Sequence, residues 1–243
     1  MRTVTFAKRN AKEILRDPLT LFFGLGFPLV LILLLSAIQA NIPVELFEIK
    51  QLTPGITVFG LSFMTLFSAT LISKDRGSSL MNRLYTTPMT ASDFIFGYTL
   101  PIIPIAAAQC LICYIAAVIL GLDISLGILY AVIFIIPVSI LYIGLGLLCG
   151  SVLTDKQVGG ICGALLTNLS AWLSGIWFDL DLIGGVFKRV SYALPFVHAV
   201  EMERALLRGD FSGIFPHILW VLGYSVILMT AAVFAFLRQM KSR

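Results

Sequence analysis

Six long apolar runs constrain most strongly what this chain can fold into. Their bounds are 19–40, 53–73, 94–120, 127–153, 158–178 and 213–237. Each is close to the ~20 mostly apolar residues that a helix needs to cross the hydrocarbon core of a bilayer. The chain is also 58% hydrophobic and only 12% charged, about half the charged share of an ordinary soluble domain. We therefore expect an all-α polytopic membrane protein with six transmembrane helices, forming a single domain over residues 1–243.

The distribution of Lys and Arg predicts which side of the membrane each loop faces. Five of the 17 lie in loops on one side, namely Lys50, Lys188, Arg189, Arg204 and Arg208. The other 12 lie in the N-terminal segment, in the loops after the second and fourth runs, and in the C-terminal segment. Cytoplasmic loops carry an excess of basic residues. We therefore expect a multi-pass protein of the cell membrane with both termini in the cytoplasm, and the net charge of +4 does not indicate a nucleic-acid partner.

Residues 1–18 predict an amphipathic helix that lies in the membrane interface. Its apolar stripe is Val4, Ala7, Ala11, Ile14 and Leu15. Its basic stripe is Lys8, Arg9, Lys12 and Arg16. Apolar burial and anionic headgroups hold such a helix at the surface of the bilayer, so we expect membrane lipids among its partners.

The polar loop 74–93, the longest interval of this kind between two apolar runs, carries both apolar and basic side chains. Leu80 and Leu84 recur at helical spacing, which predicts a short amphipathic helix. Pro88 ends that helix, because a proline disfavours helical geometry at the residue before it. From the residues alone, two interpretations stay open: a helix that docks onto a cytoplasmic partner, or an ordinary solvated loop.

The motif of this loop resembles a known family. Residues 76–80 read Arg-Gly-Ser-Ser-Leu, residues 83–84 read Arg-Leu, and residues 87–89 read Thr-Pro-Met. This pattern is similar to the cytoplasmic loop of ABC-2-type permeases, the membrane subunits of type V ABC exporters, and most of all to the drug and antibiotic exporter branch. Ser78 stands where that family more often has Thr.

The resemblance implies a role for the loop and a set of partners. Residues 74–93 would form a coupling helix that docks an ATPase subunit through Arg76, Leu80, Arg83 and Leu84. A second copy of the chain, or a homologous permease, would complete the membrane part of the transporter.

The interval 179–212 predicts two further amphipathic helices outside the membrane. Apolar residues at helical spacing precede Pro195, which breaks the segment, and a second helix covers about 196–207. Glu201 and Arg204 are three residues apart on that helix and are expected to pair. Two such helices before the last span resemble the external re-entrant hairpin of the family. The resemblance implies an outer gate that includes Pro195, Glu201 and Arg204.

Polar and small residues inside the apolar runs indicate contacts between helices or with a substrate. Gln109 and Asn168 carry amides that need protein or water partners in hydrocarbon. For each amide, two interpretations stay open: lining a substrate path or bonding a neighbouring helix. Two glycine pairs at G-x-x-x-G spacing, Gly146/Gly150 and Gly159/Gly163, predict close helix packing within the chain.

Several classes of function lack their motifs in this sequence. It contains no G-x-x-x-x-G-K-[ST] phosphate loop, no H-E-x-x-H, no G-x-S-x-G and no paired His/Cys cluster. We expect no catalytic residue and no metal site, and we expect ATP and Mg²⁺ in a partner ATPase chain. The expected function is the permease subunit of an ABC exporter that moves a drug, an antibiotic or another lipophilic molecule outward.

The alternatives are an ABC-2 permease for a polysaccharide or lipid-linked glycan, an intramembrane enzyme, and a secondary transporter. An enzyme would need acidic or His residues clustered at one membrane face. A secondary transporter is expected to show inverted repeats and coupling-ion residues. Neither feature is evident in the sequence.

Overall fold

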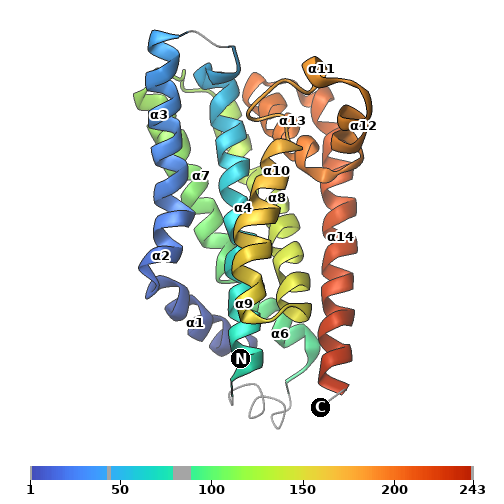
Figure 1. Cartoon of the computed structure of the whole chain (residues 1–243). Helices are drawn as coiled ribbons and strands as arrows, with labels where there is room; N and C mark the ends of the chain where they lie inside the picture. The colour runs from blue at the N-terminus through green and yellow to red at the C-terminus, as the bar shows by residue number, and fades with distance from the viewer. Residues whose placement is uncertain (1, 43–44, 79–88, 242–243) are drawn as a thin grey trace.

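The computed structural model describes residues 2–42, 45–78 and 89–241, and every regular element in these ranges is a helix (Figure 1). Five helical stretches are long and apolar enough to cross a membrane. They are Pro18–Asn41, Ile49–Gly77, Ala91–Ile119, Leu126–Val152 and Phe211–Gln239. The prediction of an all-α polytopic membrane protein is therefore confirmed.

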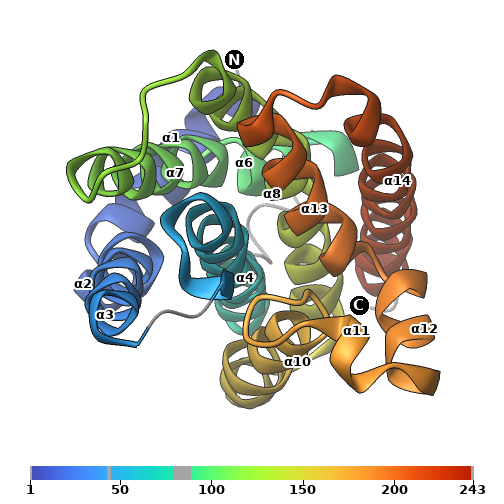
Figure 2. The same cartoon turned by 90° about the horizontal axis from the view of Figure 1, so that it is seen from above.

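Helix α4 (Ile49–Gly77) is the centre of the bundle. Figure 2 shows it between α3 (Phe27–Asn41), α7 (Ile102–Ile119) and α8 (Leu126–Val152). Its most apolar window is 89% buried, whereas that of the last helix, α14 (Phe211–Lys241), is 17% buried. Helix α14 therefore leaves most of its surface to lipid, and α4 leaves almost none.

Close backbone contact joins α8 to α4. A Cβ atom at Gly150 would lie 2.6 Å from the carbonyl oxygen of Ala69, and one at Gly146 would overlap Ser68. The predicted packing of this glycine pair within the chain is confirmed. The second pair is divided. A Cβ at Gly163 would lie 3.4 Å from the side chain of Leu66 on α4, whereas a Cβ at Gly159 would meet no atom within 4 Å in the described part of the chain.

The first and third spans are each bent near a proline. The first consists of α2 (Pro18–Leu21), a π-helical turn η1 (Phe22–Gly26) and α3. Pro28 has no N–H to donate to the preceding turn, which favours such a widened turn. The third consists of α6 (Ala91–Thr99) and α7, which meet at Pro101.

The fifth expected span, 158–178, needs a correction. The structure has α9 (Asp155–Val158), a π-helix η3 (Gly159–Leu166) and α10 (Thr167–Trp172), and residues 173–178 lie outside the helix. The helix is only 18 residues long and begins with the polar residues Asp155, Lys156 and Gln157, and it is not among the five candidate spans. Residues 155–172 would extend about 27 Å even if all were at the α-helical rise of 1.5 Å per residue, which is less than the ~30 Å hydrocarbon core. The count of six spans stays a prediction.

The interval 179–212 folds into three helices where two were expected. They are α11 (Leu180–Ile183), α12 (Gly185–Ala193) and α13 (Pro195–Arg208). The extra break falls at Gly184, whose φ of 62° favours glycine. Pro195 occupies the first turn of α13, where its missing N–H costs nothing, and Gly209 ends the helix with φ 74°. Helix α13 is largely buried and packs on α4, α8 and α14.

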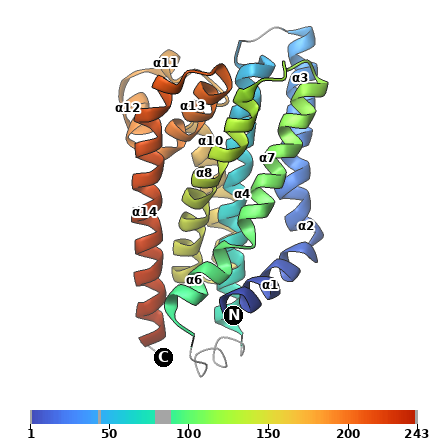
Figure 3. The same cartoon turned by 180° about the vertical axis from the view of Figure 1, so that it is seen from behind.

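The two ends of the bundle hold different segments of the chain, grouped as the predicted topology groups them. Figures 1 and 3 place the N-terminus, the C-terminus and α9 at one end, with the ends of α4 and α6 that adjoin residues 79–88. Helices α11–α13 lie at the opposite end. We call the end that holds both termini the lower end.

The N-terminal helix α1 (Arg2–Leu15) packs a face that includes Phe6 and Asn10, outside its expected apolar stripe, against the protein. Phe6, Asn10 and Ile14 are buried against the protein, whereas Val4 and Leu15 are 53% and 61% exposed. The reason is Gly97 on α6, where a side chain would overlap the ring of Phe6. The helix therefore packs on α6 and leaves part of its expected apolar stripe to the surroundings.

Candidate functional site

The lower end of α4 carries a buried carboxylate. Asp75 is 2% exposed. Its Oδ2 accepts a hydrogen bond from Arg9 Nη1 at 2.6 Å and another from Tyr98 Oη at 2.9 Å. Arg9 lies on α1 and Tyr98 on α6, so this one carboxylate joins three helices.

Further contacts fix α1 against α6. Asn10 Nδ2 donates to the carbonyl oxygen of Gly97 at 2.9 Å. Within α1, Arg9 Nη2 also forms an ion pair with Glu13 Oε2 at 2.8 Å. Thr3 donates to Asp93 at the start of α6. The edge of the Phe6 ring meets the ring of Tyr98, with centroids 5.0 Å apart.

Two residues of α4 reach the end of α8 and the start of α9. Arg76 Nη1 donates to the carbonyl oxygens of Gly150 and Leu153 at 2.6 and 3.1 Å. These carbonyls end a helix and have no partner within it, so a cation is well suited to them. Ser73 Oγ donates to Asp155 Oδ1 at 3.2 Å.

We call Arg9, Ser73, Asp75, Arg76 and Tyr98 the α4 base. It ties the end of α4 to α1, α6, α8 and α9. The chain continues from this end into residues 79–88, so a displacement of that loop would act on five helices together. Leu80, Arg83 and Leu84 lie outside the described residues, and their docking role stays a prediction. Of the expected coupling helix, residues 74–77 continue α4 and residues 91–93 begin α6.

At the opposite end, Arg204 connects α13 to two other segments. It pairs with Glu201, Nη1 to Oε1 at 2.8 Å, as the spacing predicts. Its Nη2 donates to the carbonyl oxygen of Gly175 at 3.3 Å, and its Nε donates to that of Gln51 at 3.5 Å. Only 8% of Arg204 is exposed. These contacts hold α13 against the start of α4 and the turn after α10.

A cavity of about 320 Å³ opens beside this arginine. Glu45, Asp179, Asp181 and Glu201 line it together with Arg204 and Arg208. In the described ranges, no three His, Cys, Asp or Glu side chains converge as metal ligands would.

The comparison with protein families decides which class of membrane protein carries this arrangement. The family model described as ABC-2 type transporter matches residues 1–207. This chain belongs to the ABC-2 type transporter family. It is therefore an ABC permease subunit, a transport component and not a catalytic one. A comparison with individual curated proteins found no match.

The permease holds Gln109 between two of its own helices. The side chain is fully buried. Its Nε2 donates to the carbonyl oxygen of Thr57 on α4 at 3.2 Å and lies 3.5 Å from Cys113 Sγ. A side chain at Gly60 would overlap this amide. In this conformation Gln109 bonds a neighbouring helix, which is one of the two interpretations left open.

Asn168 has the opposite environment. Its side chain is exposed on α10, and its Nδ2 donates to the carbonyl oxygen of Ala164 at 2.8 Å, one turn earlier. Gln109 and Asn168 therefore do not lie together in one path within this chain.

Two contacts between distant residues of the permease had no signal in the sequence. Arg9 and Asp75 are 66 positions apart, and no periodicity relates them. His198 and His217 meet, Nδ1 to Nδ1 at 2.9 Å, with His198 stacked on Trp220 at 4.7 Å between centroids. This contact joins α13 to α14.

Proposed function

We propose that this permease is the membrane half of an ATP-driven exporter and that a separate ATPase subunit docks on the loop 74–93. The observation that carries the proposal is the α4 base. An ATPase that pulls or pushes on residues 79–88 would act first on the end of α4, and Asp75 and Arg76 would pass that motion to α1, α6 and α8. The sequence lacks a phosphate loop, which supports ATP and Mg²⁺ binding in the partner.

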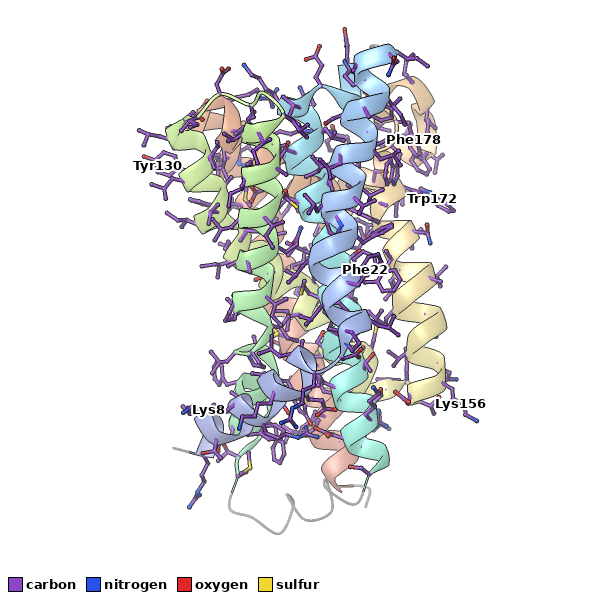
Figure 4. The ribbon with its side chains drawn as sticks, turned by 90° about the vertical axis from the view of Figure 1, so that its left-hand side faces the viewer. Lys8, Phe22, Tyr130, Lys156, Trp172 and Phe178 are labelled. Atoms are coloured by element: carbon purple, nitrogen blue, oxygen red, sulfur yellow. The ribbon has the colours of Figure 1, made fainter. Side chains whose placement is uncertain are left out.

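The second permease subunit is proposed to cover the face formed by η3 and α10. Asn168 is exposed there, and an amide facing hydrocarbon is costly unless protein or water covers it. Gly159 has open space in front of it in the described part of the chain, and Trp172 is 51% exposed. Figure 4 shows this side of the molecule, with Trp172 on α10 and Phe22 on η1. A path between two subunits would then run past Asn168.

The proposed substrate is a drug, an antibiotic or another lipophilic molecule. The described spans carry their charged residues at their ends, which does not favour a path for small ions built on fixed charges. Export, with both termini in the cytoplasm of a cell-membrane protein, is part of the same proposal.

The test is ATP-driven uptake of a lipophilic dye into inside-out vesicles that contain the permease and its ATPase. We expect uptake that stops without ATP, and a changed rate or dye preference in Asn168→Leu while the complex still assembles. The matched control is Asn41→Leu. Asn41 is also exposed and also donates to a carbonyl one turn earlier, that of Ala37 at 2.9 Å. ATP-independent uptake, or equal effects of the two substitutions, would count against the proposal.

A further inference from the structure

A large cavity lies at the lower end between α1, α2 and α4, separate from the face of α10. Its volume is about 900 Å³. Its position coincides with the level at which α1 turns into the first span at Asp17 and Pro18. In a protein whose bundle crosses the bilayer, this level is the boundary between headgroups and hydrocarbon.

The cavity is lined by more cations than anions. Lys8, Arg9 and Lys12 come from α1, Arg16 directly follows this helix, and Lys74 comes from α4. Lys8 and Lys12 are four residues apart, so they lie on one face of the helix, and Arg16 follows four residues later.

Both acidic residues of the lining already have partners, and the lining cations outnumber them. Glu13 pairs with Arg9. Asp17 caps α2 by accepting from the N–H groups of Leu19 and Thr20 at 3.1 and 3.3 Å. Partial burial opposes ionisation of Asp17, but the hydrogen bonds from Thr20 and Leu19 outweigh it and lower its pKa. The remaining charge in the cavity is therefore positive.

The uncharged part of the lining combines apolar side chains with Thr5, Thr20 and Thr70. Ile14, Phe67 and Leu71 belong to the wall. Leu15 and Leu19, beside the cavity on the outer surface, are 61% and 68% exposed, which is expected of side chains that face lipid. A cationic rim beside an apolar wall matches an amphiphile with an anionic head.

We propose that this cavity binds one anionic glycerophospholipid, with its phosphate diester among Lys8, Lys12, Arg16 and Lys74 and an acyl chain along Phe67 and Leu71. A free phosphate compound shares the headgroup chemistry but does not use the apolar wall. The bound lipid would bridge α1 and α4 next to the α4 base. This site goes beyond the transport function and does not depend on it.

The experiment titrates the purified full chain, in a neutral detergent, with palmitoyl-oleoyl phosphatidylglycerol and counts bound lipid by native mass spectrometry. We expect one saturable lipid per chain, with clearly weaker binding of the phosphatidylcholine analogue. Lys12→Gln with Lys74→Gln should weaken phosphatidylglycerol binding roughly 30-fold, because two cations near the headgroup are lost. Lys12→Arg with Lys74→Arg keeps both charges and should retain binding.

The matched control is Lys156→Gln with Arg238→Gln. These residues are exposed at the same end but do not line the cavity, and Figure 4 shows Lys156 on α9, away from Lys8. Equal weakening in both pairs would mean a diffuse surface effect and would overturn the proposal. Binding of glycerophosphoglycerol as tight as that of the lipid would assign the site to a soluble phosphate. The variant with Lys12→Gln and Lys74→Gln could instead bind lipid as the wild type does but no longer co-purify with the ATPase. This result would assign the cavity to contact with the ATPase and would overturn the proposal.

Discussion

Asp75 and Glu203 are the two carboxylates buried in the described part of the chain, and their surroundings differ. Asp75 accepts from Arg9 and Tyr98. Neither carboxyl oxygen of Glu203 has a hydrogen-bond partner, and the residue is fully buried on α13, outside the candidate spans. Burial raises the pKa of Glu203 well above its usual value. Glu203 is therefore expected to keep its proton to a higher pH in the folded protein than in the unfolded chain.

The first prediction concerns the pH dependence of stability at Glu203. In the unfolded chain a Glu ionises near pH 4.3, whereas the folded protein keeps its proton to a higher pH. Above about pH 4.3 the folded state therefore binds more protons, and the free energy of unfolding falls as pH rises, by at most about 1.4 kcal/mol per pH unit. Glu203→Gln should remove this slope and leave the protein at least as stable at pH 7.

Thermal unfolding between pH 5 and pH 8 checks this prediction, with Glu48→Gln, an exposed carboxylate, as the control. The same slope in the wild type and in Glu203→Gln would show that Glu203 is not the group that titrates.

The second prediction compares the two ion pairs of Arg9. Arg9→Gln leaves Asp75 buried with only Tyr98 as a partner. Arg9 is 37% exposed but Asp75 is buried, and removing the partner of a buried charge is costly; allowing for solvent screening at Arg9, we expect a loss of about 2 kcal/mol in the free energy of unfolding. Glu13→Gln breaks a pair whose side chains are 37% and 35% exposed, and should cost at most about 1 kcal/mol. Equilibrium unfolding in mixed micelles measures both, and equal costs would contradict the assignment of Asp75 as the centre of the α4 base.

At the scale of elements, the contact between α4 and α8 depends on glycine. Gly150→Ala places a methyl group against the carbonyl oxygen of Ala69, 2.6 Å away, so one helix must move. Gly159→Ala adds the same methyl group where no described atom lies within 4 Å. The gain in helix propensity is the same for both. We predict that Gly150→Ala is less stable than Gly159→Ala by about 2 kcal/mol, the usual scale of overpacking. Equal melting temperatures of the monomeric variants would contradict this.

Much of the element structure was predictable because it follows from local patterns. The apolar runs predict the long helices, Pro195 and Gly209 mark the ends of α13, and the spacing of Glu201 and Arg204 predicts their pair. The break at Leu173 was not predictable, because apolar residues continue through Trp177 and only the positive φ of Gly175, 71°, shows the turn.

Contacts between distant segments had no such signal. Phe6 was left out of the expected apolar stripe of α1 because its burial depends on Gly97, 91 positions later. The α4 base was missed for the same reason, because Arg9 and Asp75 belong to different helices. The position of α13 inside the bundle was also missed, since its amphipathic pattern is that of a surface helix.

At the scale of the whole molecule, the two ends of the bundle are expected to face opposite sides of the membrane. Lys156→Cys lies at the lower end and Asp181→Cys at the other, and both positions are exposed. We predict that an impermeant thiol reagent applied to intact cells labels Asp181→Cys and reaches Lys156→Cys only after the cytoplasmic face is opened. Three of the four native cysteines are buried, and the fourth, Cys149, is partly buried, which limits background. Labelling of Lys156→Cys from outside would reverse the orientation.

The central claim is that the loop 74–93 receives the ATPase and that the α4 base transmits its motion. Leu84→Ala removes an expected apolar anchor, at a cost of roughly 2–3 kcal/mol for a buried leucine, and Arg83→Glu reverses an expected orienting charge. The double variant should bind the ATPase at least about 30-fold more weakly, while its melting temperature stays that of the wild type. Lys156→Glu, a charge reversal elsewhere at the lower end, serves as the control.

Co-purification of the ATPase with the permease is the measurement that tests this claim most directly. The account predicts that ATPase recovery is lost in the Leu84→Ala, Arg83→Glu variant and kept in Lys156→Glu. Full ATPase recovery with the double variant would contradict it.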